Sequence, residues 1–293
     1  MTVYVIGGIN QDIVATSDSH LRPGETLTGN DLNYYPGGKG ANQAIAAARA
    51  GAEVAMIGCT GDDAAGSELR KYLAESSVDV SRIVIKKGVP TGTALIVVAN
   101  GENSIIVVLG ANKTVGPDNI DGISFTAEDI VVAQFETPIE TTLAAFKTAR
   151  QAGARTILNP SPVVPIQQEL LGQTDILVVN EHEFELIFET PLGPVLNDDA
   201  DGPDGFKGTL VITLGSDGVL ALSENDRIRQ AGCAVEVTDS TGAGDCFMGY
   251  LAAALHNEED LPLAIALANL AASVSVTLPG AASSIPDRES LLE

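Results

Sequence analysis

The sequence predicts one α/β domain over residues 1–293, arranged as a three-layer α/β/α sandwich with a mainly parallel central sheet. Short apolar runs alternate with helical segments along the chain, which is typical of βαβ units. Two stretches rich in turn residues and β-branched side chains interrupt the alternation and predict a small antiparallel β lid, inserted at about residues 13–36 and 92–109. The 45% hydrophobic content supports a sizeable, mostly aliphatic core.

The elements of the α/β body are predicted from the residues that begin and end them. The first strand stops at Gly7 and Gly8, where the backbone must turn, and Gly51 is suited to end an Ala-rich helix. Asp62 and Asp63 offer N-cap chemistry for the helix that follows. Strands are expected at residues 3–6, 53–58, 130–133, 156–158, 176–179, 210–213 and 234–238. Helices are expected at residues 41–50, from the cap at 62–63 to about 74, at 139–151 and at 246–255, and a further helical stretch follows a break at 257–261.

The lid is predicted from its turn chemistry. Asn100-Gly101 lies between the β-branched runs 93–99 and 104–108, and this dipeptide favours a tight hairpin turn. Residues 13–35 are similarly rich in turn residues and alternation. Residues 190–208 form another turn-rich stretch, for which no regular element is predicted.

Composition excludes several classes of partner. The net charge of −23 would repel nucleic acids and anionic membranes, so neither is expected as a partner. A phosphate group could still bind if backbone N–H groups and a divalent cation held it. The three cysteines have neither zinc-ligand spacing nor a disulfide pattern, and no signal peptide or long apolar run is apparent, so we expect a cytoplasmic protein.

The strongest chemical motif is Asp239-Ser240-Thr241-Gly242-Ala243-Gly244-Asp245, between the strand expected at 234–238 and an apolar helix. A glycine turn at a helix N-terminus presents unpaired N–H groups and the positive end of the helix dipole, and both attract a phosphate. Asp245 stands at the start of this helix, where the same field stabilises its carboxylate. A base beside a phosphate site suits phosphoryl transfer to an alcohol.

The simpler interpretation is that the glycines form an ordinary turn and Asp245 caps a helix. Two other nucleotide motifs do not fit. A Rossmann fingerprint needs a small residue where Phe247 stands, and a Walker A loop needs Ser or Thr after its lysine, whereas Gly40 follows Lys39.

The motif resembles the C-terminal signature of the PfkB family of sugar kinases, and a second segment resembles the N-terminal signature of that family. Further similar segments extend along nearly the whole chain and are closest to the ribokinase group, which implies a ribokinase-like fold. The N-terminal signature is Gly37-Gly38-Lys39-Gly40-Ala41-Asn42-Gln43-Ala44, and the other segments are Gly8-Ile9-Asn10-Gln11-Asp12, Pro23-Gly24-Glu25-Thr26, Gln134-Phe135-Glu136, Asn159-Pro160-Ser161-Pro162, Asn180-Glu181-His182-Glu183, Thr213-Leu214-Gly215-Ser216-Asp217-Gly218 and Gly280-Ala281.

The resemblance implies ATP-dependent phosphorylation of the primary 5-hydroxyl of a pentose, with D-ribose favoured. Asp245 would be the general base, and Gly242, Ala243 and Gly244 would form the anion hole. The residues that would contact the sugar are Asn10, Asp12, Gly38, Lys39, Asn42, Glu136 and Asp245. An Asx-turn at Asn10, a solvated Lys39, a capping Asn42 and a surface Glu136 are the structural alternatives.

On the nucleotide side, the resemblance implies contacts from Asn180, Glu183, Thr213, Gly215, Gly218, Gly244 and Asn269. Glu183 would act on Mg²⁺ indirectly, through water, which suits a cation that keeps most of its hydration shell. His182 is interpreted as structural. Ordinary turns at the glycines and a helix-surface role for Asn269 are the alternatives.

Two further properties follow only from the resemblance. A monovalent cation, usually K⁺, would stabilise the anion-hole loop, bound by Asp239, by the backbone carbonyls of Thr241, Ser275, Leu278 and Gly280, and by Ser284. The lid would pair with a second copy to form a homodimer and so cover its exposed strand edges.

Several functions remain open at this point. Within the family, a deoxyribokinase or another pentose kinase is the nearest alternative. An adenosine kinase fits less well because the chain has no Trp platform, and a phosphofructokinase would need more basic residues near Lys39. A sugar-binding sensor without catalysis would have no physical need for the carboxylate of Asp245.

Overall fold

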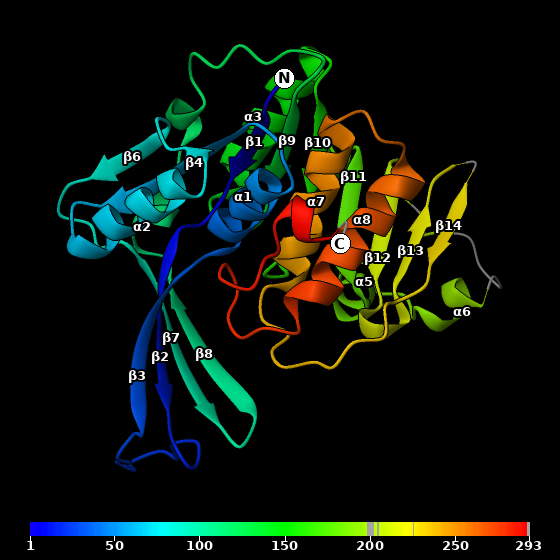
Figure 1. The fold of residues 1–293 in the computed structure, drawn as a ribbon. Coiled ribbons are helices and arrows are strands. Elements are labelled where there is room, and N and C mark those ends of the chain that lie inside the picture. Colours follow the sequence, from blue (N-terminus) through cyan, green and yellow to red (C-terminus); the bar gives the residue numbers. More distant parts are fainter. Residues whose placement is uncertain (198–201, 204, 225, 292–293) are drawn as a thin grey trace.

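The computed structural model describes residues 1–197, 202–203, 205–224 and 226–291 (Figure 1). Within this part of the chain a central sheet has the strand order β14-β13-β12-β11-β10-β9-β1-β4-β5, with β6 paired beside β4. All pairs from β12 to β5 are parallel, and β13 is antiparallel to both of its neighbours, β12 and β14. The strands are β1 (Val3–Ile6), β4 (Val54–Gly61), β5 (Val78–Asp79), β6 (Ile83–Lys86), β9 (Ile130–Ala133), β10 (Arg155–Leu158), β11 (Ile176–Asn180), β12 (Thr209–Thr213), β13 (Val219–Leu222) and β14 (Arg227–Gln230).

Helices cover both faces of this sheet, because the parallel strands are apolar on both sides. Val3 and Val5 of β1 pack into one core with α1, α7 and α8, which Figure 1 shows on the near face. Ile6 packs into the other core with Phe146 and Phe184. The α-helices of the described chain are α1 (Lys39–Arg49), α2 (Ala64–Glu75), α3 (Ile139–Gln151), α4 (Gln168–Leu171), α5 (Glu181–Phe188), α6 (Gly193–Leu196), α7 (Ala243–His256) and α8 (Leu261–Ser275).

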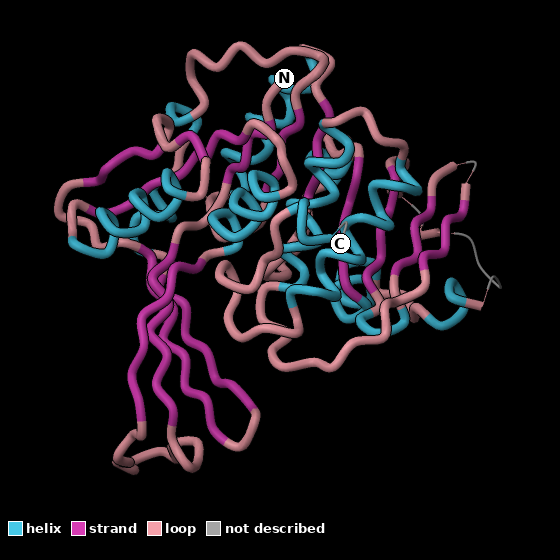
Figure 2. Tube along the Cα trace, in the orientation of Figure 1, coloured by secondary structure: helices cyan, strands magenta, loops and turns pink. Residues whose placement is uncertain are grey.

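A separate four-stranded sheet projects from the body as the lid (Figure 2). It consists of two antiparallel hairpins, β2 (Asn10–Thr16) with β3 (Asp31–Gly37) and β7 (Gly92–Ala99) with β8 (Glu102–Val108), joined by a parallel pairing of β2 with β7. Asn100 and Gly101 both have positive φ, 54° and 77°, as a tight hairpin turn requires. The turn predicted at this dipeptide is confirmed.

Most of the predicted elements of the body are confirmed to within a few residues. Asp63 accepts a hydrogen bond from the Gly66 N–H and caps α2, and Gly51 follows α1 with a φ of 94°. One strand prediction is wrong: residues 234–238 form no strand. The N–H groups of Thr238 and Asp239 instead donate to the carbonyl of Val276, at 2.8 and 3.1 Å, so this segment runs over the C-terminal end of α8.

The helix after the glycine loop, α7, begins three residues earlier than expected, so Asp245 lies in its first turn. In the turn-rich stretch 190–208, the short helix α6 forms, and residues 198–201 and 204 lie outside the described residues. Among the helices of the described chain, none combines the length and apolarity needed to cross a membrane.

Candidate active site

Asp245 lies at the N-terminal end of α7, where a glycine loop leads into the helix. Gly242 takes the N-cap position with a φ of 79°, and a Cβ there would lie 2.8 Å from the Cβ of Ala281. Only glycine therefore fits this turn without strain. No side chain of the described residues caps α7, and a Cβ on Gly244 would meet open space, whereas the Ala243 N–H donates to the Ser240 carbonyl at 3.3 Å.

Two side-chain amides hold the Asp245 carboxylate, which is only 6% exposed. Asn42 donates from Nδ2 to Oδ2 at 3.0 Å, and Gln43 donates from Nε2 to Oδ1 at 2.9 Å. Both amides come from the N-terminal part of α1, which packs against α7. The structure thus brings the two signatures together, although Asn42 and Gln43 precede Asp245 by 203 and 202 residues in the sequence.

The carboxylates of Asp12 and Glu136 and the side chain of Lys39 lie near the Asp245 carboxylate. Burial, followed by the charge of Asp245, raises the pKa of Asp12 to about 6. Burial also raises the pKa of Glu136 to about 7, although Glu136 Oε2 accepts a hydrogen bond of 2.8 Å from the Lys39 backbone N–H. The Asp245 charge is the main cause that raises the pKa of Lys39. The residues predicted for the sugar therefore form one electrostatically coupled cluster.

Asn10 and Gly38 lie beside each other, next to Glu136 of this cluster. The Asn10 side chain donates to Glu136 Oε1 at 3.5 Å, and a Cβ on Gly38 would lie 2.7 Å from the Gly8 carbonyl oxygen. Among the described residues, the buried Asn42 Oδ1 has no hydrogen-bond partner. A buried acceptor without a partner, on a side chain that contacts Asp245, is suited to receive a hydroxyl group of a ligand.

Three functional side chains were not predicted. Asn112 is fully buried and ties the sugar-side strand in place: it donates to Asn10 Oδ1 at 2.7 Å and exchanges hydrogen bonds with both backbone groups of Ile9. Nothing in the local sequence around Asn112 signals this role. Gln43 and Gln134 occur within the segments that resemble the family, and that resemblance was their only signal.

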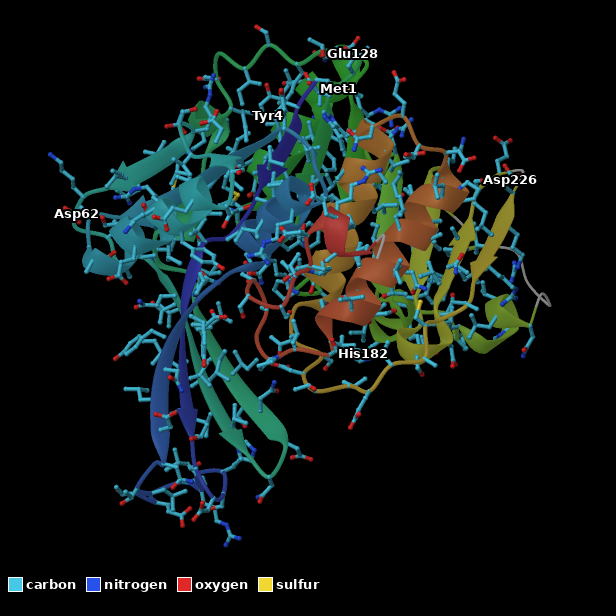
Figure 3. The ribbon with its side chains drawn as sticks, viewed as in Figure 1. Met1, Tyr4, Asp62, Glu128, His182 and Asp226 are labelled. Atoms are coloured by element: carbon cyan, nitrogen blue, oxygen red, sulfur yellow. The ribbon has the colours of Figure 1, made fainter. Side chains whose placement is uncertain are left out.

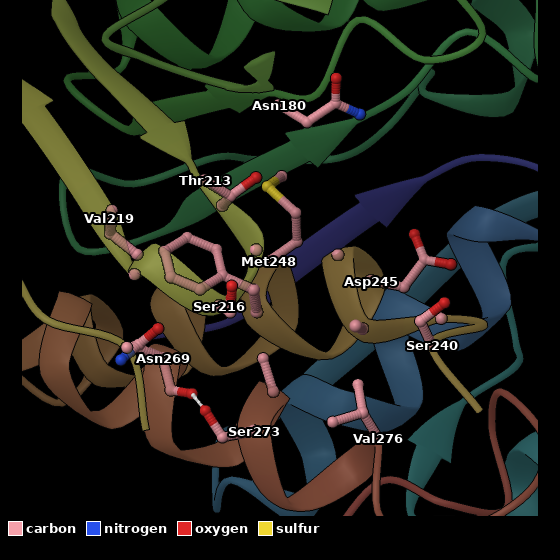
Figure 4. Close-up of a pocket in the computed structure, with 18 of the residues that line it drawn as sticks. Asn180, Thr213, Ser216, Val219, Ser240, Asp245, Met248, Asn269, Ser273 and Val276 are labelled. Carbon is pink, nitrogen blue, oxygen red and sulfur yellow. Dashed lines mark hydrogen bonds between the residues drawn. The ribbon is translucent and has the colours of Figure 1, made fainter. Parts of the chain in front are cut away.

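A cavity of about 770 Å³ opens beside Asp245. Its wall contains every residue predicted for the nucleotide, and in Figure 4 Asp245 and Asn269 lie on opposite sides of the view. Lys39 and Asp245 also line it, so the cavity adjoins the cluster of carboxylates. Val235 and Val237, from the segment wrongly expected as a strand, supply apolar wall instead. The predicted residues in this wall are Asn180, Glu183, Thr213, Gly215, Gly218, Gly244 and Asn269.

Asn180 and Glu183 form a reciprocal cap at the start of α5. Glu183 N–H donates to Asn180 Oδ1 at 2.8 Å, and Asn180 N–H donates to Glu183 Oε2 at 2.9 Å. Within the described chain no group of three or more His, Cys, Asp or Glu side chains could hold a metal ion. Glu183 lines the cavity, where its carboxylate could reach a Mg²⁺ ion that keeps most of its water ligands. His182 is exposed on the surface of α5 (Figure 3).

The residues expected around a monovalent cation also lie together. Asp239 Oδ1 accepts from Thr241 N–H and Oδ2 from Gly280 N–H, both at 2.9 Å, so the carboxylate ties the glycine loop to residues 275–284. Burial opposes ionisation of Asp239, but these hydrogen bonds outweigh it and keep the pKa below its ordinary value. Ser275 and Ser284 are buried, and Leu278 N–H bonds to the Ser275 carbonyl at 3.3 Å. These contacts join the glycine loop to the segment in which the cation was expected.

Comparisons of the sequence and of the structure with known proteins all find sugar kinases. A model described as pfkB family carbohydrate kinase matches residues 2–288. The chain is similar to a ribokinase of Haemophilus influenzae, with 37% identity over 100% of this chain and 97% of that protein. It is 30% identical to a deoxyribokinase of Salmonella typhimurium, over 100% of this chain and 98% of that one. The solved structure of Arabidopsis thaliana ribokinase complexed with ribose and ATP has a TM-score of 0.88 and 29% identity, and the match covers 99% of this chain and 97% of that one.

Proposed function

The chain belongs to the pfkB family of carbohydrate kinases, and we propose that it transfers the γ-phosphate of ATP to the 5-hydroxyl of D-ribose, forming ribose 5-phosphate and ADP. The observation that carries this proposal is the position of Asp245. Its carboxylate adjoins both the 770 Å³ cavity and the polar cluster of Asp12, Asn42 and Glu136. A base at this junction lies between a bound nucleotide and a bound alcohol.

In the proposed reaction, Asp245 accepts the proton of the sugar hydroxyl as its oxygen attacks the γ-phosphorus. The new O–P bond forms while the bond from the γ-phosphorus to the β–γ bridging oxygen breaks, and ADP leaves. The proposed anion hole is formed by Gly242, Ala243 and Gly244 at the N-terminal end of α7, where the positive end of the helix dipole would stabilise the negative charge that develops on the transferred group. Closure of the lid over the sugar would exclude water and limit hydrolysis of ATP.

The sugar hydroxyl groups are assigned to a ring of hydrogen-bonding side chains. Asn10, Asp12 and Glu136 accept or donate on one side, while Asn42 Oδ1 is free to accept from a hydroxyl. Gly38 allows the ligand to approach the backbone, and Lys39 supplies a positive charge between the sugar and the nucleotide cavity. Because Asn10 is itself held by Asn112, the ring is organised before a sugar binds.

Two cations belong to the proposal. Mg²⁺, bound with ATP, would neutralise phosphate charge, and Glu183 would orient its water ligands. A monovalent cation such as K⁺ would be held by Asp239, by the carbonyls of Thr241, Ser275, Leu278 and Gly280, and by Ser284. The hydrogen bonds of Asp239 to Thr241 and Gly280 support a structural effect on the anion-hole loop.

We also propose a homodimer that pairs through the lid. Every residue of β8 is exposed, and its side chains Ile105, Ile106, Val107 and Val108 are 47–65% exposed. An exposed apolar edge strand of this kind is normally covered by another surface. A cytoplasmic location is proposed as well, and it is supported by the free thiols of Cys59, Cys233 and Cys246.

The test is ADP formation with Mg-ATP and a panel of ribose, deoxyribose, hexoses and nucleosides, with and without K⁺. We expect ribose to give the highest kcat/KM, and Asp245→Asn to lower kcat by roughly 10²–10⁴-fold while ATP still binds. Higher kcat/KM with deoxyribose would favour the deoxyribokinase activity of the Salmonella relative. Sugar binding without turnover in the unmodified protein would identify a sensor and refute the kinase proposal.

A further inference from the structure

We propose that Gln43 and Gln134 are positioning residues for the reaction, because together they fix the orientation of the Asp245 carboxylate. This inference deepens the proposed kinase function and rests on it. Both glutamines are fully buried, and neither lines the nucleotide cavity. Their role is therefore separate from binding of ATP, and the sugar-side ring described above does not include them.

The direction of each hydrogen bond follows from the chemistry of the groups. A carboxylate only accepts hydrogen bonds, so Gln43 must present its amide nitrogen to Asp245 Oδ1, at 2.9 Å. The amide oxygen of Gln43 then faces away and accepts from Gln134 Nε2. Gln134 thus holds the Gln43 amide in the only orientation that donates to the base.

Close packing of α1 against α7 makes this contact possible. Gly249 lies one helical turn after Asp245, and a Cβ there would lie 2.3 Å from the Cβ of Ala46 and 2.6 Å from the Gln43 carbonyl oxygen. Only glycine allows the two helices to approach this closely. The short distance between the helix backbones lets the Gln43 side chain reach the carboxylate.

The two amides have different tasks. Asn42 stands on the sugar side with a free Oδ1, whereas Gln43 is enclosed by protein and has no atom available for a ligand. With one oxygen held by each amide, the carboxylate cannot rotate, and its remaining lone pairs keep a fixed direction towards the hydroxyl. Since proton transfer depends on this geometry, loss of Gln43 should lower kcat more than it raises KM.

Gln43→Met tests the proposal, because Met approximates the shape of Gln but donates no hydrogen bond. We expect kcat with the preferred sugar to fall by roughly tenfold or more, and KM for sugar and ATP to change by less than about threefold. The substitution removes one hydrogen bond from the carboxylate of Asp245 and adds no charge. The other charged groups that face it, Asp12 of β2, Lys39 of α1 and Glu136 after β9, stay unchanged.

Gln134→Met tests the second link. It should lower kcat in the same direction, and it should add little in the Gln43→Met background if Gln134 acts only through Gln43. Thr142→Val is the matched control, since it also replaces a fully buried polar side chain, in α3, whose Oγ1 has no partner among the described residues. We expect its kcat to stay within about twofold of the parent value.

A readout without turnover separates this inference from the proposed function. The ¹³C chemical shift of the Asp245 carboxyl group, assigned by its loss in Asp245→Asn, is compared at one fixed pH in the parent protein and in Gln43→Met. A changed chemical shift in the variant, as expected on loss of the hydrogen bond, supports the positioning role even if ribose is not the substrate. An unchanged chemical shift with unchanged kcat in a folded Gln43→Met protein, or effects of the two glutamine variants that add fully, would overturn it.

Discussion

Burial of Glu136 is expected to lower the free energy of unfolding as the pH rises. Replacing Glu136 with glutamine should remove this pH dependence. Glu136 is 7% exposed, and burial raises its pKa from 4.5 to about 7. Between these values the folded protein binds a proton that the unfolded chain has released, so the free energy of unfolding falls as pH rises through this window. Below pH 4.5 both states are protonated, and above pH 7 both are ionised, so the contribution is constant there.

The size of the effect follows from the same pKa shift. A shift from 4.5 to about 7 corresponds to about 3 kcal/mol of unfolding free energy, all of it lost by pH 8. Glutamine has nearly the shape of the protonated carboxyl group, and its oxygen can still accept from the Lys39 backbone N–H. The amide NH2 of the variant cannot accept from Asn10, so the variant should be somewhat less stable than the parent near pH 4. Between pH 4 and pH 8 the difference in unfolding free energy should change by about 3 kcal/mol in favour of the variant.

Urea unfolding followed by circular dichroism, at constant ionic strength and without ligands, measures this difference at each pH. Glu128→Gln is the control, since Glu128 is exposed on the surface (Figure 3) and its replacement should change stability little at any pH. Parallel stability curves for Glu136→Gln and the parent from pH 4 to pH 8 would refute the reasoning.

Three further substitutions have definite expected outcomes. Gly249→Ala should push α1 away from α7 and cost about 1–3 kcal/mol of unfolding free energy, with a fall in kcat, and urea unfolding and steady-state kinetics would measure both. Asn112→Leu should raise KM for ribose with little change in KM for ATP, because Asn10 and the Ile9 backbone lose their hydrogen-bond partner. Equal changes in both KM values would contradict the role assigned to Asn112. Ile106→Asp should shift the protein from dimer to monomer in sedimentation velocity, because it places a charge on the exposed lid face. A dimer of unchanged stability would show that this face is not the interface.

The alternation of short apolar runs and helical segments was sufficient to predict the layered body. The reason is local: β1 and β9 are apolar on both faces, as a strand covered on both sides requires, and Asp63, Gly51 and the Asn100-Gly101 pair mark ends and turns through their own side chains or backbone freedom. Such signals need no information from the rest of the chain.

Residues 234–238 show where local reasoning failed. The run has strand-like composition, with Val235 and Val237 on alternate positions, but both side chains are more than a third exposed. β13 and β14 extend the sheet beyond β12 instead, as an antiparallel hairpin, so this run has no strand to pair with and crosses the end of α8. Propensity alone cannot decide which of several candidate strands occupies a sheet edge.

By itself, the sequence determined the layered body, the position of the lid and the glycine loop that precedes Asp245, because each depends on residues adjacent in the chain. The tertiary structure alone decided that Gln43 bonds to Asp245, that Gln134 orients Gln43 and that Asn112 supports Asn10. These partners are 91–202 residues apart in the sequence, and the close approach of α1 and α7 at Gly249 brings the first pair within hydrogen-bonding distance. Contacts of this kind arise from how helices and strands pack, and no local pattern encodes them.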